Sequence, residues 1–200
     1  MKWEGNGLRL LTQATEALGN PAKGRRAYSM ALNKVATTVN SSVKKSVAQQ
    51  MGTSQRNIVK HGGMKIYKAS AGNLMAVIDV RGGYLPLKDF SPRQGKKGVS
   101  AAEWGNRKMH PGTWINRARL ATTKFASTGR AKAGGHVFKN TGGENKVSGR
   151  KNAIEVLWGP AVPREVVRDE SQRTFYRIAD TRMPIEVRRA IKALTKGAVS

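Results

Sequence analysis

Cysteine is absent from the 200 residues of this chain. Its absence excludes thiolate catalysis, disulfide frameworks and cysteine-based zinc sites. Long apolar runs are absent too: the longest aliphatic run covers residues 74–78, whereas a membrane helix needs about 20 apolar residues. The first residues hold no apolar stretch of the length that a signal peptide requires, so we expect the chain to be made and kept in a cytoplasm.

Acidic and apolar residues are both scarce. Twelve Asp and Glu face 37 Lys and Arg, which gives a net charge of +25, and hydrophobic residues make up only 38% of the chain. We therefore expect a thin core. No acidic residue lies between Glu16 and Asp79 or between Trp104 and Gly143, so the positive charge belongs to the body of the protein rather than to a tail. A basic body indicates a surface that faces a polyanion or partner subunits.

Apolar spacing predicts the helices. Leucines from Leu8 to Leu18 fit one face of a short helix that Gly19-Asn20-Pro21 ends. Apolar residues three or four positions apart predict a long amphipathic helix over residues 22–50. Gly52 ends this helix, and Thr53 or Ser54 can cap a short one that continues through Val59.

The middle of the chain is predicted to form strands, and its end is predicted to form helices. Short strands are predicted at residues 64–69, 74–80, 84–87, 113–120, 136–139 and 154–158. Residues 88–112 lack periodicity and are predicted to form a long basic loop or arm, and Gly-rich joints are predicted at residues 129–135 and 142–143. Helix resumes at Pro163, and Pro184 is expected to open a last helix.

This block order of helix, sheet and helix favours an α+β fold rather than strict α/β alternation. We expect a long N-terminal amphipathic helix packed on a small, mostly antiparallel sheet, with a long basic loop and C-terminal helices. The chain is predicted to be a single domain over residues 1–200, with an N-terminal segment at 1–25, the basic loop at 88–112 and a C-terminal helical segment at 163–200.

Catalytic and metal-binding patterns are missing from the sequence. His61, His110 and His136 have no histidine or carboxylate at helical spacing, so they are predicted to be turn or surface histidines rather than metal ligands. No serine has the context of a nucleophile, and Asp169-Glu170 is the only adjacent carboxylate pair. We therefore predict no catalytic site, no metal and no cofactor.

The basic loop holds the candidate binding residues. Lys and Arg in glycine-flanked loops can grip phosphates or acidic protein surfaces, and exposed tryptophans can anchor a partner or stack on bases. The candidates for contact with DNA or an acidic partner are Arg93, Gln94, Lys96, Lys97, Arg107 and Lys108. The candidates for a partner interface are Trp104 and Trp114.

Four stretches of the sequence resemble the minor tail protein Z family of long-tailed bacteriophages, the tail-completion proteins. Residues 26–60 resemble the family's Ala-Leu-Asn-Lys helix and the short helix after it, and residues 86–100 its basic loop. Residues 105–115 are similar to the segment where the chain re-enters the sheet, and residues 157–163 to the Gly-Pro-x-Val-Pro strand end. Together the four stretches cover most of residues 26–165.

The resemblance implies a non-enzymatic virion protein at the head-proximal end of the tail, assembled in the cytoplasm of the host bacterium. Such a protein completes the tail for head–tail joining and helps to position the DNA end. The implied partners are the tail terminator, tail tube and neck proteins, the genomic DNA end and further copies of the chain in a homo-oligomeric ring, with no membrane and no small-molecule substrate. The alternative is a sequence-nonspecific nucleic-acid-binding protein that is not part of a virion.

Overall fold

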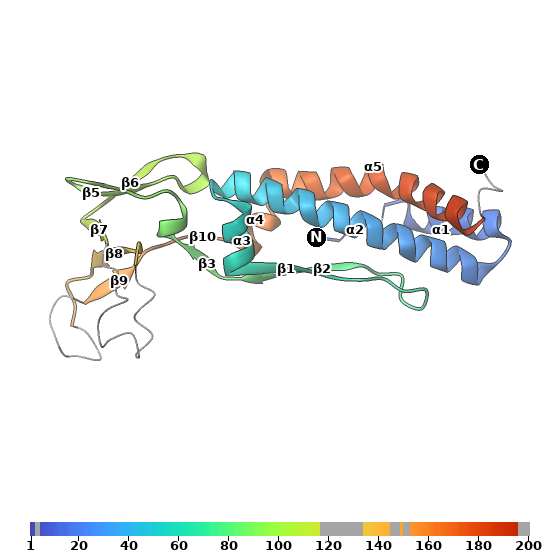
Figure 1. The fold of residues 1–200 in the computed structure, drawn as a ribbon, viewed down its shortest axis with the longest axis horizontal. Helices are drawn as coiled ribbons and strands as arrows, with labels where there is room; N and C mark the ends of the chain where they lie inside the picture. Colours follow the sequence, from blue (N-terminus) through green and yellow to red (C-terminus); the bar gives the residue numbers. More distant parts are fainter. Residues whose placement is uncertain (3–4, 117–133, 145–148, 150–152, 196–200) are drawn as a thin grey trace. The chain divides into compact units, whose positions relative to one another are not determined.

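The computed structural model describes residues 1–2, 5–116, 134–144, 149 and 153–195. The chain divides into two compact units, which can be followed along the colours of Figure 1. Unit 1 comprises Met1–Val47, Gly62–Gly82 and Pro163–Ser200, and unit 2 comprises Ala48–His61 and Gly83–Val162. A single domain over residues 1–200 stays a prediction.

Helices dominate unit 1 and agree with the predicted ones. They are α1 (Gly7–Leu18), α2 (Pro21–Met51), α4 (Val162–Val166) and α5 (Asp169–Leu194). The last four residues of α2 and the first residue of α4 belong to unit 2. The predicted stop between α1 and α2 is confirmed: Gly19 adopts a left-handed conformation, and the Asn20 side chain accepts a hydrogen bond from Ala22 N at 2.8 Å. The apolar stripe of α2 is buried, with Val39, Val43 and Val47 at its centre. No helix in the described residues is both long enough and apolar enough to cross a membrane.

A two-stranded antiparallel hairpin completes unit 1. β1 (Gly62–Tyr67) pairs with β2 (Val77–Gly82) over six residue pairs. Asn33 of α2 holds the hairpin, because its side chain donates to Ala69 O at 2.9 Å and accepts from Ala69 N at 2.7 Å. The predicted strands are thus present, and Asn33 links α2 to the segment that joins them.

Proline 184 does not open a new helix, as the sequence suggested, but lies inside α5. The buried face of α5 continues through it, with Ala179, Met183, Val187 and Ala190 at steps of three or four residues. Burial of this continuous face outweighs the cost of about 3 kcal/mol that a proline imposes on a helix interior.

The described residues of unit 2 include α3 (Gln55–His61) and eight short strands in three antiparallel sheets. β10 (Trp158–Ala161) pairs with β3 (Tyr84–Pro86). The second sheet has the order β4–β5–β6, formed by Arg93–Gly95, Gly98–Ala101 and Lys108–Pro111. The third has the order β7–β8–β9, formed by Thr113–Ile115, Val137–Asn140 and Ile154–Val156.

These strands confirm the α+β class and correct two details of the prediction. Residues 88–112 contain three paired strands rather than one long loop, and these strands of three or four residues are too short to show a period in the sequence. The single expected strand at residues 154–158 is two strands in different sheets, since Leu157 donates to Val137 O at 2.9 Å while its own carbonyl accepts from Leu87 N at 3.1 Å. Residues 117–120 and 129–133, which also belonged to predicted elements, lie outside the described residues.

Close backbone approach holds unit 2 together at Gly52. This residue has φ +75°, and a Cβ atom added there would lie 2.5 Å from Ala102 O and 2.5 Å from Gly105 N. The C-terminal end of α2 therefore packs directly on the 3₁₀ turn η2 (Glu103–Gly105). Fully buried side chains that surround this region include Met51, Ile58, Leu87 and Phe90.

Replacement of Gly52 tests this contact. Gly52→Ala is expected to lower the free energy of unfolding by more than about 2 kcal/mol, because it adds a steric collision to the left-handed strain of about 1–2 kcal/mol. Gly19→Ala is the control, since Gly19 also has positive φ but no atom lies within 4 Å of its added Cβ. Equal losses for the two variants in urea denaturation would show that the approach of η2 to α2 is not tight.

Candidate polyanion interface

The three-stranded sheet β4–β5–β6 carries most of the predicted binding residues. Arg93 lies opposite Ser100, and Ser100 lies opposite Met109. Directly paired residues share a face of an antiparallel sheet, so Arg93 and Arg107 lie on one face, and Lys108 lies on the other. Lys96 and Lys97 form the two-residue turn between β4 and β5. The structure thus gathers these cations on one small sheet but spreads them over both of its faces.

Glycine is required where this hairpin turns. Gly98 has φ +148°, and a Cβ there would collide with the carbonyl oxygen of His110 on β6. The close approach of β5 and β6 fixes where the lysine turn projects from the sheet.

Two of the candidates hold the sheet together. Arg107 donates from Nη1 to Ser100 O at 3.0 Å and from Nη2 to Ser91 O at 3.1 Å. Gln94 accepts from Ile115 N at 2.8 Å and donates to Gly95 O at 3.1 Å, so its amide links β4 to β7. Both side chains are therefore structural, in addition to any contact with a partner.

The remaining candidate cations are available to contact a polyanion. The side chains of Arg93, Lys96, Lys97 and Lys108 are exposed and form no hydrogen bond or ion pair with the described part of the chain. These residues are the stronger candidates for a polyanion contact.

No exposed carboxylate offsets this charge within the sheet. The only acidic residue between Arg93 and Pro111 is Glu103, which is 7% exposed. Its Oε2 lies 3.0 Å from His110 Nε2, so it is paired inside the protein rather than with a surface cation. The sheet therefore presents positive charge that its own residues do not neutralise.

The two predicted interface tryptophans differ. Trp114 is 37% exposed and stacks on Phe138, its partner across β7 and β8, at 6.3 Å between ring centroids. Trp104 is 51% exposed and has φ +51°, an uncommon conformation for a bulky residue. Its greater exposure makes Trp104 the better candidate for a partner contact.

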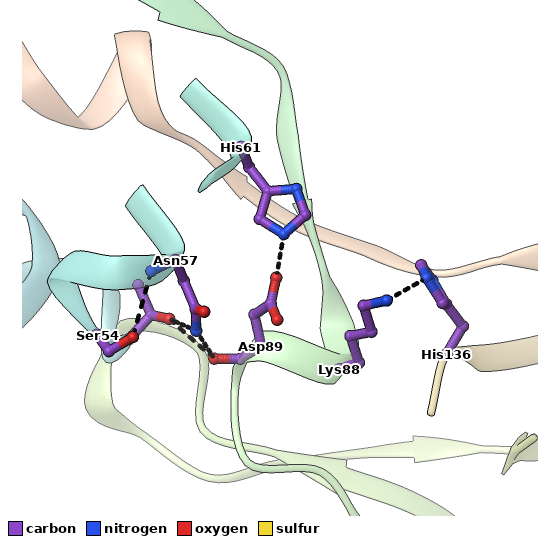
Figure 2. Close-up of polar contacts among 7 residues, drawn as sticks. Ser54, Asn57, His61, Lys88, Asp89 and His136 are labelled. Atoms are coloured by element: carbon purple, nitrogen blue, oxygen red, sulfur yellow. Dashed lines mark hydrogen bonds and ion pairs between the residues drawn. The ribbon is translucent and has the colours of Figure 1, made fainter. Parts of the chain in front are cut away.

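A second polar cluster connects α3 to η1 (Leu87–Asp89), as Figure 2 shows. The carbonyl of Asp89 accepts hydrogen bonds from Thr53 Oγ1 at 2.8 Å and from Asn57 Nδ2 at 3.3 Å. The Asp89 carboxylate lies 2.6 Å from His61 Nε2, outside hydrogen-bond alignment, so this contact is electrostatic. Ser54 caps α3 by accepting from Asn57 N at 3.3 Å, which confirms the predicted cap.

Lysine 88 and His136 form an unusual pair in the same cluster (Figure 2). Lys88 Nζ lies 2.6 Å from His136 Nε2. An ammonium group can only donate, so Nε2 accepts and the imidazole is neutral, with its proton on Nδ1. That Nδ1 is buried and has no partner among the described residues.

Burial and nearby positive charge lower the pKa of both Lys88 and His136. Burial lowers the pKa of Lys88, and the nearby Lys60 lowers it further while Asp89 opposes the change. Burial also lowers the pKa of His136, and the positive charge of Lys88 is the next largest cause. The imidazole is therefore held neutral by its surroundings.

No local pattern in the sequence predicts this cluster. The three histidines are half-buried and lie beside Asp89, Glu103 and Lys88, contacts that the sequence did not predict. The partners of His61 and His136 lie 28 and 48 positions away, and only the fold brings them together. Within the described residues, no three His, Asp or Glu side chains gather as metal ligands.

The fold and the surface define an α+β protein that carries a strongly cationic sheet. The family model of prophage minor tail protein Z matches residues 8–196, and the chain therefore belongs to this family. It is a structural component of a phage tail, in a family not known for enzymes. Neither the curated proteins nor the solved structures contain a match.

The Lys88–His136 pair predicts a pH effect. Because the pKa of His136 in the folded protein lies below its ordinary value of 6.5, the unfolded chain binds more protons there, and stability falls as the pH drops below about 6.5. Lys88→Met should raise the pKa of His136 and reduce this loss, because it removes a positive charge and the donor that favours the neutral ring.

NMR titration of the imidazole of His136 measures this change. Lys60→Met is the matched control and should give a smaller rise, since Lys60 is the weakest of the influences on His136. An unchanged or lower pKa of His136 in Lys88→Met would show that the pair does not form in solution.

Proposed function

We propose that this chain is the tail-completion subunit at the head-proximal end of a phage tail. In this role it finishes the tail for head–tail joining and helps to position the DNA end, without catalysing a reaction. It assembles as a homo-oligomeric ring with the tail terminator, tail tube and neck proteins. Family membership supports the tail itself, and the resemblance described from the sequence supports the position within it.

The observation that carries the DNA contact is the unneutralised charge of the sheet β4–β5–β6. Arg93, Lys96, Lys97 and Lys108 are exposed, while the one carboxylate of this segment is buried against His110. Such a surface suits a DNA backbone or an acidic partner ring, because phosphate contacts need only positioned cations and no base recognition. Trp104 stands in the same segment and supplies an apolar anchor for a neighbouring subunit.

Immunogold labelling tests the position. Antibody to this chain is expected to label the head–tail junction of particles from a producing lysate, on a few copies per particle. Label along the tail or at its distal tip would contradict the proposal. Unlabelled particles, with the protein found on nucleic acid, would instead favour a nucleic-acid-binding protein outside the virion.

Neutralisation of the exposed cations tests the contact. Each lost phosphate contact should reduce the salt slope of duplex DNA binding by about 0.9, so loss of the whole set should reduce it by about 3 to 4. The yield of infectious particles should fall as well. The variant carries Arg93→Gln, Lys96→Gln, Lys97→Gln and Lys108→Gln, and binding is measured by fluorescence anisotropy on a short duplex.

Two controls accompany this variant. The first control is an α2 variant with the same change of net charge at exposed positions, and it should leave the salt slope nearly unchanged. It carries Lys23→Gln, Arg26→Gln, Lys34→Gln and Lys45→Gln. Gln94→Ala should lower the free energy of unfolding by about 1–2 kcal/mol through its lost hydrogen bonds, with no change in slope. Equal salt slopes for the sheet variant and the α2 variant would show that the sheet does not contact DNA. A normal yield of infectious particles would also exclude a contact between the sheet and an acidic partner ring.

A further inference from the structure

A large apolar groove lies in unit 1, apart from the basic sheet. It has a volume of about 1450 Å³, more than the roughly 300–1,000 Å³ of a small-molecule pocket. Its walls come from α1, α2, the hairpin and the start of the C-terminal helices, with Leu11, Leu32, Val35 and Phe175 among them. Its size and apolar lining fit a polypeptide segment rather than a metabolite.

One wall of the groove is the edge of β2 rather than a face of the hairpin. Every residue of β2 from Val77 to Arg81 lines it, whereas β1 contributes only Met64 and Tyr67. Successive side chains of a strand point to opposite faces, so a groove that contacts all of them runs along the strand's edge. In the described residues β2 pairs with β1 alone, which leaves this edge without a strand partner.

Apolar side chains are exposed to solvent along this edge. Met75 is 58% exposed and Val77 is 39% exposed, although both line the groove. An unpaired edge beside exposed apolar residues is what a protein normally covers, because it invites pairing with another chain. An incoming strand would cover both features at once: its backbone would pair with β2, and its alternate side chains would enter the groove.

The charge around the groove favours an acidic occupant. Besides Arg81, Lys2 and Arg9 line it, and Asp79 is its one carboxylate among the residues that the structure describes. Asp79 is already compensated, since its Oδ2 lies 2.7 Å from Arg81 Nε and Lys65 stands opposite it on β1. A second copy of this chain, with a net charge of +25, suits such a rim poorly.

We propose that the groove binds an extended segment of another protein of the tail, which adds to the free edge of β2 as a third strand and carries acidic residues between apolar ones. The proposal rests on the family membership and not on the DNA contact of the basic sheet. The two can therefore fail separately.

Crosslinking during tail assembly tests the occupant. A photoreactive amino acid replaces Val77 in the full chain, tails are assembled in the producing bacterium, and the crosslinked peptide is sequenced by mass spectrometry. The expected adduct is an acidic segment with alternating apolar residues from a different tail protein. Adducts to a second copy or to this chain's own segments would overturn the proposal, as would adducts no more frequent than at Val59, an exposed valine of α3 outside the groove.

Hydrogen exchange tests the strand addition. The backbone amides of residues 77–81 that point away from β1 should exchange at least tenfold more slowly in purified tails than in the free chain, because these edge amides gain partners. Unchanged exchange in tails that contain the chain would overturn strand addition even if a crosslink forms. Absence of the chain from tails would instead contradict its tail function.

A charge variant gives a third readout. Val77→Glu should reduce incorporation into tails at least tenfold, since it places a carboxylate where acidic residues are expected to dock. Val59→Glu is the matched control and should incorporate normally. Thermal unfolding of both free variants checks the fold, and normal incorporation of a folded Val77→Glu would overturn the proposal.

Discussion

The excess of cations over carboxylates is the constraint on which the arrangement of this protein depends. Because 37 side chains are basic and only 12 are acidic, each carboxylate that is buried inside the protein leaves more net positive charge on its surface. Asp89 and Glu103 contact histidines in unit 2, and Glu186 contacts Arg189 in α5 at 2.7 Å. Buried carboxylates require such partners, because an unpaired charge in the interior is costly. The surface is strongly cationic because basic side chains outnumber acidic ones, and the acids that are paired inside the protein offset none of the exposed charge.

Small sheets and close backbone contacts replace a large core in unit 2. Three antiparallel sheets of two or three short strands are joined at single residues, such as Leu157 and Gln94, whose hydrogen bonds reach from one sheet to the next. At Gly52 and Gly98 a Cβ would collide with the backbone of a neighbouring segment, and at Gly159 it would collide with the Phe90 ring. A chain with little apolar surface can gain contacts in this way, because glycine allows backbones to approach where side chains would keep them apart.

The two exposed surfaces suit different partners. The sheet β4–β5–β6 offers positioned cations and one exposed tryptophan, features that suit a polyanion or an acidic ring. The groove beside β2 offers an unpaired backbone edge and apolar side chains, features that suit a polypeptide strand. A structural protein that joins other components needs separate surfaces of this kind, since each contact then forms without competition from the other.

Much of the secondary structure could be predicted because its signals are local. The stripe of α2, the stop at Gly19-Asn20-Pro21 and the Ser54 cap depend on residues within a few positions of one another, and the structure confirms them. Local signals misled at Pro184, where the packing of a continuous buried face keeps α5 intact, and at residues 88–112, where the strands are too short to show a period.

The sequence by itself determined the charge, the absence of thiol chemistry, the α+β class and the resemblance to the family, since all of these follow from composition or from residues close together in the chain. Only the tertiary structure decided which candidate cations are free and which, like Arg107, bind backbone carbonyls. It alone paired Lys88 with His136 and left the edge of β2 open. These features depend on contacts between distant segments, and such contacts form only when the whole chain buries its apolar surface.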